Sequence, residues 1–158
     1  MCKSSPNLPS TREGEAPSLW EGWGGKTKNS KLLTKLKTMK KEIRLMIVDD
    51  HKMIRDGIKL MLKNNPEIKL IAEAENGLEA IKYIDNNPTA VDVILMDISM
   101  PKLDGIAATK DIKGNHKNIH VLAITMHIEE SYINDMMKAG ASGYILKESG
   151  RDDLIEAI

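Results

Sequence analysis

Five polar residues, far apart in the chain, each stand at the end of a short apolar run or one residue beyond it. They are Asp49, Asp50, Asp97, Thr125 and Lys147. Two carboxylates about 4 Å apart repel each other by about 4 kcal/mol at an effective dielectric constant near 20, so three carboxylates in one place need positive charge. Lys147 supplies one charge, and a divalent ion supplies two. An oxygen ligand set favours Mg²⁺ over zinc, and the sequence has no cluster of His and Cys that points to another metal.

These groups are suited to accept a phosphoryl group. One carboxylate attacks phosphorus in line, the ammonium and the metal neutralise the equatorial oxygens, and the hydroxyl donates a hydrogen bond to one of them. Because the residues are distant in the sequence, the site exists only if the elements that carry them bring them together.

Apolar runs that predict strands alternate with helical patterns from residue 42 onward. The predicted strands are 45–48, 68–74, 91–96, 121–124 and 143–146. The predicted helices are 54–62, 78–84, 106–112 and 130–139, and a last helix begins near 151 and is cut short by the end of the chain. This alternation predicts an α/β fold with a doubly wound, five-stranded parallel sheet covered on both faces. Ligands of such sheets bind at the carboxyl ends of the strands, where the five polar residues are placed.

The charges divide the chain into two regions. The totals are 23 Lys and Arg and 23 Asp and Glu in 158 residues, but residues 1–41 carry nine basic and three acidic residues. Residues 1–30 are rich in Ser, Pro and Gly, so we expect 1–41 to be a disordered basic leader, native or added by the choice of start site. The alternative is a short amphipathic helix over 30–41 for a membrane surface or nucleic acid. The domain itself is expected at 42–158.

Several classes of protein are excluded by composition. A single cysteine, Cys2, excludes a disulfide framework, and the absence of an apolar run of about 20 residues excludes a transmembrane helix. The first residues show no secretory signal. We therefore expect a cytoplasmic protein without a membrane partner.

Taken together, the motifs resemble the receiver domain of two-component response regulators. The resemblance covers about 42–158 and is carried by Asp49-Asp50-His51, residues 95–105 around Asp97, residues 125–127, and residues 143–147. When residues 54–57 are included, the pattern is most similar to the branch of the family that usually carries a LuxR-type (NarL/FixJ-like) helix-turn-helix output domain. The resemblance implies the flavodoxin-like strand order 2-1-3-4-5.

The resemblance also implies a role for each site residue. Asp97 would be the phosphoacceptor, Asp50 a direct Mg²⁺ ligand, and Asp49 a ligand mainly through water. Asp97 and the backbone carbonyl of Ser99 would complete the protein ligands of the metal.

Three further roles follow from the same resemblance. Thr125 and Lys147 would contact the bound phosphoryl group, and Tyr144 would be an aromatic switch that turns inward with Thr125. Met126 stands where the family often has a small residue, so we expect it to crowd the pocket and slow phosphoryl exchange.

The partners implied are a sensor histidine kinase as phosphodonor and a second copy of the chain in a homodimer on phosphorylation. The phospho-switch would control transcription through an output domain that we do not expect on this chain, because no nucleic-acid-binding domain follows in the sequence. We expect a signalling module and not an enzyme.

Three other functions are open alternatives at this point. A stand-alone or degenerate receiver would only bind partners. A Mg²⁺-dependent aspartyl-phosphate phosphatase needs a second acid two residues after its nucleophile, where this chain has Ser99. A nucleotide or flavin binder needs a phosphate-binding loop, and no Walker or G-x-G-x-x-G motif occurs.

Overall fold

A computed structural model describes residues 42–126 and 129–158, which belong to the compact unit Lys40–Ile158. The leader expected over 1–41, and the amphipathic helix that was its alternative, lie outside the described residues. Strands and helices alternate along this unit. The elements are β1 (Ile43–Val48), α2 (Lys52–Leu62), β2 (Ile68–Ala74), α3 (Gly77–Asn86), β3 (Val93–Asp97), α4 (Gly105–Asn115), β4 (His120–Thr125), α5 (Glu130–Ala139), β5 (Gly143–Leu146) and α6 (Arg151–Ala157).

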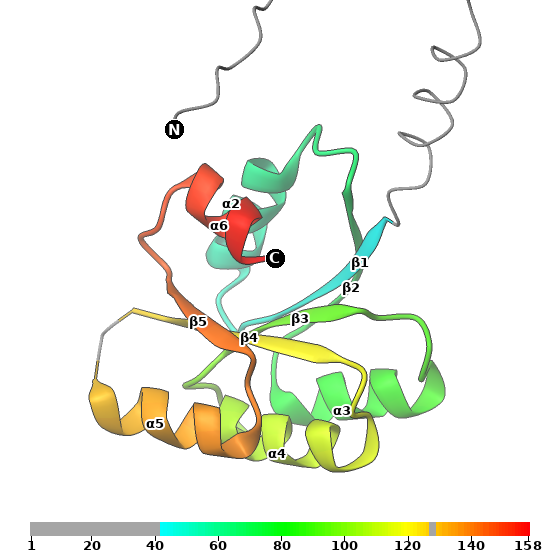
Figure 1. Cartoon of the computed structure of the whole chain (residues 1–158), viewed down its shortest axis with the longest axis vertical. Helices are drawn as coiled ribbons and strands as arrows, with labels where there is room; N and C mark the ends of the chain where they lie inside the picture. Colours follow the sequence, from blue (N-terminus) through cyan, green and yellow to red (C-terminus); the bar gives the residue numbers. More distant parts are fainter. Residues whose placement is uncertain (1–41, 127–128) are drawn as a thin grey trace, which may run out of the picture. The chain divides into compact units, whose positions relative to one another are not determined.

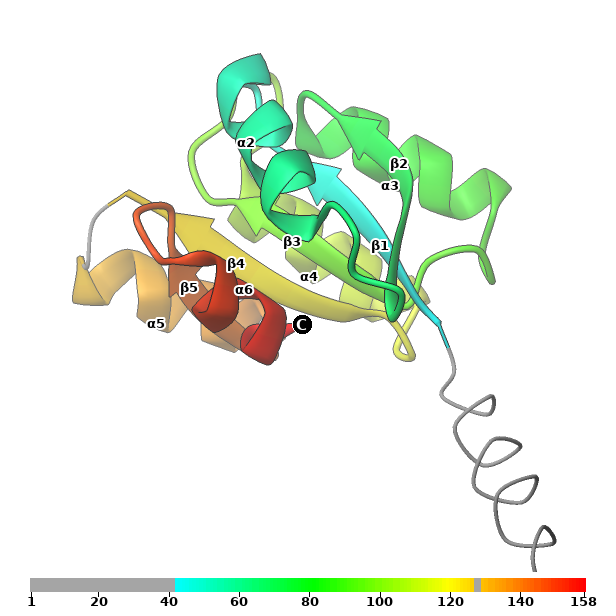
Figure 2. The ribbon, with the colours of Figure 1, turned by 90° about the horizontal axis from the view of Figure 1, so that it is seen from above.

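The five strands form one parallel sheet in the order β2-β1-β3-β4-β5. This confirms the predicted α/β class, the doubly wound arrangement and the flavodoxin-like order. In Figure 1, α2 and α6 lie above the sheet, whereas α3, α4 and α5 lie below it. Figure 2 shows the arrowheads of β1, β3 and β4 on the same side, which is the edge where the sequence predicts the site.

Apolar residues fill both faces of the sheet because its strands are covered by helices on either side. Successive residues of β1 point to opposite faces of the sheet. Met46 and Val48 belong to the core between the sheet and helices α3, α4 and α5, whereas Leu45 and Ile47 belong to the core between the sheet and helices α2 and α6. All four are fully buried. Since complete burial of one such side chain contributes about 1.5–3 kcal/mol, the central strands form a rigid support for the residues at their ends.

Several predicted boundaries differ from the structure by up to three residues: the helix predicted over 106–112 spans Gly105–Asn115, and β3 differs as well. The sequence pattern predicts a strand over 91–96, but the strand spans Val93–Asp97. The register with β1 begins where Val93 lies opposite Leu45. The preceding residue, Asp92, still donates its backbone N–H to the carbonyl of Arg44 at 2.8 Å, and its side chain binds the Arg44 guanidinium. The predicted end of α5 is confirmed, because Gly140 adopts a left-handed backbone with φ of 105° at that helix terminus.

No helix among residues 42–126 and 129–158 combines the length and the apolar character needed to cross a membrane.

Candidate functional site

Strand register brings the first two acidic segments together. Val48, the last residue of β1, pairs with Met96 of β3, so Asp49 lies abreast of Asp97 at the carboxyl edge. The possible ligand atoms of Asp49, Asp50, His51 and Asp97 all lie within 4.8 Å of one another. Asp49 and Asp97 are buried, with exposed fractions of 0% and 4%. The structure therefore brings the three predicted carboxylates into one cluster.

Lys147 joins this cluster from the end of β5. Its Nζ lies 2.7 Å from Oδ2 of Asp49 and 2.8 Å from Oδ2 of Asp97, and only 5% of its side chain is exposed. The position follows from the register, because Leu146 pairs with Thr125 at the end of β4. One ammonium is thus shared by two buried carboxylates.

The charges at the site shift two pKa values. Burial raises the pKa of Asp97, the hydrogen bond and charge of Lys147 oppose this shift, and the negative charge of Asp49 adds to it. Burial acts to lower the pKa of Lys147, but its hydrogen bonds to Asp49 and Asp97 outweigh burial, so the pKa lies above its ordinary value. Lys147 is therefore held as a cation at neutral pH.

The cluster carries more negative charge than Lys147 can neutralise. Three carboxylates and one ammonium leave a net charge of −2 when His51 is neutral, which matches one divalent ion. Oδ1 of Asp50 is buried and accepts no hydrogen bond within the described residues, although Nδ1 of His51 lies 3.0 Å away. A buried carboxylate oxygen without a hydrogen bond is the kind of atom that a hard cation binds. The residues present thus fit the predicted Mg²⁺.

His51 is a residue whose place near the site the sequence reasoning missed. It shows no metal-ligand spacing in the sequence, which favours a surface or loop residue. Its side chain is indeed 65% exposed, but Nδ1 lies 3.4 Å from Oδ1 of Asp49 as well as close to Asp50, and its backbone N–H donates to Oδ1 of Asp49. Its place directly after two aspartates at a strand end was the available signal.

The loop between β3 and α4 is folded tightly against Asp97. The backbone N–H of Ser99 hydrogen-bonds to the Asp97 carboxylate and acts to lower its pKa. Asp104 caps α4 by accepting a hydrogen bond of 2.8 Å from the N–H of Ala107. A Cβ atom at Gly105 would lie 2.0 Å from the carbonyl oxygen of Asp97, so only glycine fits this close approach. The role of the Ser99 carbonyl as a metal ligand stays a prediction.

The two remaining predicted residues lie on neighbouring strands. Thr125 ends β4, is buried, and accepts the backbone N–H of Lys147 at 2.8 Å through its carbonyl. Tyr144 lies on β5 opposite Ala123, and 47% of it is exposed. Met126, expected to crowd the pocket, is 61% exposed. The switching role of Tyr144 and the effect of Met126 on exchange stay predictions.

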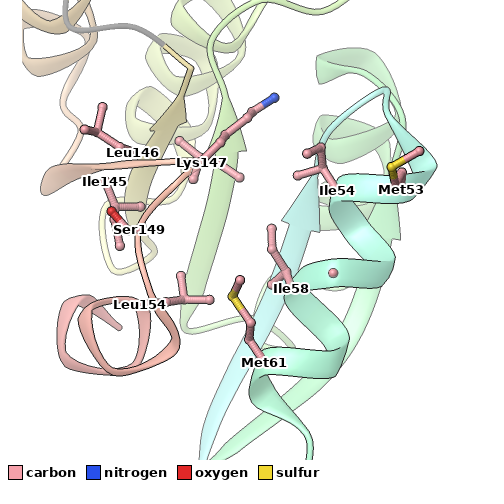
Figure 3. A pocket seen from close by; sticks show the side chains of 11 residues that line it. Met53, Ile54, Ile58, Met61, Ile145, Leu146, Lys147, Ser149 and Leu154 are labelled. Carbon is pink, nitrogen blue, oxygen red and sulfur yellow. The ribbon is translucent and has the colours of Figure 1, made fainter.

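An apolar pocket of about 100 Å³ lies between α2, β5 and the start of α6. Figure 3 shows Lys147 at its edge, with the amino nitrogen pointing away from Met61 and Leu154. Apart from Lys147 and Ser149, its lining residues bear no polar side chain, so the pocket offers little chemistry of its own. The aliphatic part of Lys147 packs at this pocket, while its ammonium group pairs with the carboxylates of the acidic cluster.

Comparisons with known proteins agree with this geometry. Residues 45–158 match the sequence model of the response regulator receiver domain. The chain is 43% identical over 118 residues to the transcriptional regulatory protein DegU of Brevibacillus brevis, and the match covers 74% of this chain and 49% of DegU. The chain spans about half the length of the curated relatives it matches.

Two solved structures extend the comparison to the fold. A LuxR-family two-component response regulator from Aurantimonas sp. SI85-9A1 aligns with a TM-score of 0.67 and 32% identity, over 73% of this chain and 81% of that one. A chain of the CheX–CheY–BeF₃–Mg²⁺ complex from Borrelia burgdorferi aligns with a TM-score of 0.68 and 27% identity, over 73% of this chain and 85% of that one. The first match agrees with the LuxR-type branch indicated by the motifs.

Proposed function

Because the chain belongs to the response regulator receiver domain family, we propose that it accepts a phosphoryl group on Asp97 from a sensor histidine kinase. The observation that carries this proposal is the charge of the cluster, in which Asp97 shares Lys147 with Asp49 and Asp50 adds a third carboxylate. A carboxylate of this kind is a nucleophile, and the excess negative charge is suited to a divalent ion.

The proposed step conserves atoms and electrons. One Asp97 oxygen attacks phosphorus in line and forms a P–O bond, while the P–N bond of the donor phosphohistidine breaks and its electron pair returns to the imidazole nitrogen. Lys147, which bridges Asp49 and Asp97 before the reaction, neutralises a phosphoryl oxygen after it. The hydroxyl of Thr125 donates a hydrogen bond to another phosphoryl oxygen.

Mg²⁺ is the proposed metal, with Asp50 and Asp97 as direct ligands, Asp49 mainly through water, and the carbonyl of Ser99 as a further ligand. When bound, the ion supplies positive charge for the oxygens of the group in transfer. The presence of Mg²⁺ in the CheX–CheY–BeF₃ complex supports this choice for a chain of the same fold. This chain's own part is to hold three direct oxygen ligands, and Asp49 as a ligand mainly through water, at one edge of a rigid sheet.

The proposed output is a change of surface and not turnover of a substrate. Receiver domains are signalling modules, and Ser99 occupies the position where the aspartyl-phosphate phosphatases need an acid. We propose that Tyr144 takes part in the conformational switch and that phosphorylation leads to formation of a homodimer. We propose that the protein acts in the cytoplasm. The similarity to DegU, a transcriptional regulatory protein, supports control of transcription as the consequence of the switch.

Acetyl phosphate tests the proposal without a kinase. Intact-mass spectrometry of the full chain with acetyl phosphate and Mg²⁺ should give an adduct of one phosphate. Asp97→Ala should abolish it, and EDTA should suppress it in the wild-type chain. Asp92→Asn, directly before the other end of the same strand, is the matched control and should keep the adduct. An adduct that persists in Asp97→Ala, or none in the wild type, would remove the basis for the proposal.

A further inference from the structure

Helix α2 carries a guanidinium that is almost completely buried. Only 8% of the Arg55 side chain is exposed, and its donors reach three acceptors on three different residues. Nη1 donates to the backbone carbonyl of Asp49 at 2.7 Å, Nε to Oε2 of Glu73 at 3.1 Å, and Nη2 to Oε1 of Glu75 at 3.0 Å. A buried cation is costly unless it is paired and hydrogen-bonded, and Arg55 meets both conditions.

These contacts fix the backbone of Asp49 from both sides. Its N–H donates to the carbonyl of Ala74 at 3.1 Å, and its carbonyl accepts from Arg55. The peptide that carries Asp49, and that leads directly to Asp50, is thereby attached to the end of β2 and to α2. Arg55 touches no carboxylate of the cluster in any of its three contacts, since Glu73 and Glu75 lie outside it.

We propose that Arg55 is a positioning residue that orients the Asp49-Asp50 segment for a divalent cation. This inference rests on the proposed function, because it needs the Mg²⁺ site described above. Partners of this kind behind the ligands of a metal commonly change its affinity by about 10–100-fold when they are removed.

If Arg55 acted only through its charge, its removal would increase the affinity for Mg²⁺, whereas the loss of a positioning residue would decrease it. The guanidinium is paired with Glu73 and Glu75, so its loss leaves two carboxylates near the cluster without this cation. Their negative charge would strengthen cation binding, whereas a misplaced Asp49-Asp50 segment would weaken it. The sign of the change in Mg²⁺ affinity therefore separates positioning from electrostatics.

Lys59 provides a matched control on the same helix. Its Nζ also pairs with Glu73, at 3.0 Å and 3.2 Å, and with Asp56 at 2.7 Å. Both of these partners are side chains outside the acidic cluster, so Lys59→Gln removes a cation and an ion pair to Glu73 without releasing the backbone of Asp49.

The experiment is a calorimetric titration of the full chain with Mg²⁺. Arg55→Lys retains the charge but not the fork that spans a carbonyl and two carboxylates, so its Kd should rise at least about tenfold. Lys59→Gln should stay within about twofold of the wild type, which is less than the effect of a lost positioning partner. At saturating Mg²⁺, Arg55→Lys should recover the wild-type rate of labelling by acetyl phosphate, because only the affinity for the ion is impaired.

Three results would overturn the inference: an unchanged Kd in Arg55→Lys, an equal loss in Lys59→Gln, or a labelling rate that saturating Mg²⁺ does not restore. If Arg55→Lys does not fold, Arg55→Gln decides the matter, since weaker binding supports positioning and tighter binding contradicts it. No Mg²⁺ binding by the wild type would overturn the proposed function itself, whereas equal binding by wild type and variant removes only the role of Arg55.

Discussion

The two ends of strand β3 each carry an aspartate, and their surroundings differ. Asp92 directly precedes the strand and is paired with Arg44, since its carboxylate accepts from the backbone N–H, Nε and Nη2 of Arg44 at 3.0, 2.8 and 2.7 Å. Asp97 closes the strand and must share Lys147 with Asp49. Among the described residues, the charge of Asp92 is balanced by that of Arg44, whereas the cluster around Asp97 keeps an excess of two negative charges.

This difference separates a structural ion pair from a binding site. The planar fork of Arg44 matches the carboxylate of Asp92, so the two opposite charges neutralise each other. Around Asp97, burial and the neighbouring Asp49 raise the pKa of the carboxyl, which means that ionisation of Asp97 opposes folding. A cation-binding site needs an excess of negative charge held in a fixed position, and the carboxylates at the end of the sheet meet this requirement.

The largest expected effect is the loss of the shared ammonium. Lys147→Met leaves two buried carboxylates without their cation and should lower the free energy of unfolding by about 3 kcal/mol. Arg44→Met removes a cation whose side chain is 34% exposed, beside a carboxylate that is 21% exposed, so it should cost only about 1 kcal/mol. Urea denaturation at pH 7 in EDTA measures both. Equal decreases in the free energy of unfolding for the two variants would contradict the difference between a partly exposed ion pair at Asp92 and a buried, shared ammonium at Asp97.

Neutralising one carboxylate at each end should give changes of opposite sign. Asp50→Asn removes one repelling charge from the partly exposed side of the cluster and should stabilise the metal-free protein by about 1 kcal/mol. Asp92→Asn removes half of a balanced pair and should destabilise it by about 1 kcal/mol. The same urea experiment without metal compares them, and destabilisation by Asp50→Asn would contradict the assignment of excess charge.

A smaller effect is expected in the pH dependence of stability. Since the folded pKa of Asp97 is raised above the ordinary 3.8, the native state binds more protons than the unfolded state just above that value. Stability should therefore fall as pH rises from 3.8 through the raised pKa. Subtracting the pH profile of Asp97→Asn from that of the wild type isolates this contribution, whereas Asp92→Asn should retain it. A difference that rises with pH over this window would have the wrong sign.

Much of the fold was predictable because its signals are local. Apolar runs, breakers such as Pro66 and the cap at Gly140 place the strands and helices within a few residues. Parallel topology then places strand ends at one edge, which is why Asp49, Asp97 and Lys147 could be expected to meet.

The rest depends on contacts between distant residues. Asp92 falls inside an apolar run that predicts a strand, and its partner, Arg44, lies 48 positions earlier. Arg55 is one of several charged residues in a helix, and only packing against β2 and the Asp49 backbone makes it buried. His51 differs from these two, because its place after Asp49 and Asp50 is a local signal, but its distances to their carboxylates depend on the folded loop.

The most direct test is the response of stability to Mg²⁺. The Kd of the wild type is first measured by calorimetry, and unfolding is then followed with and without the ion at about 100 times that Kd. The wild type should gain about 2.7 kcal/mol, and Asp50→Ala should lose most of that gain. An equal gain in both proteins would contradict the claim that the excess charge at the carboxyl edge of the sheet is a magnesium site.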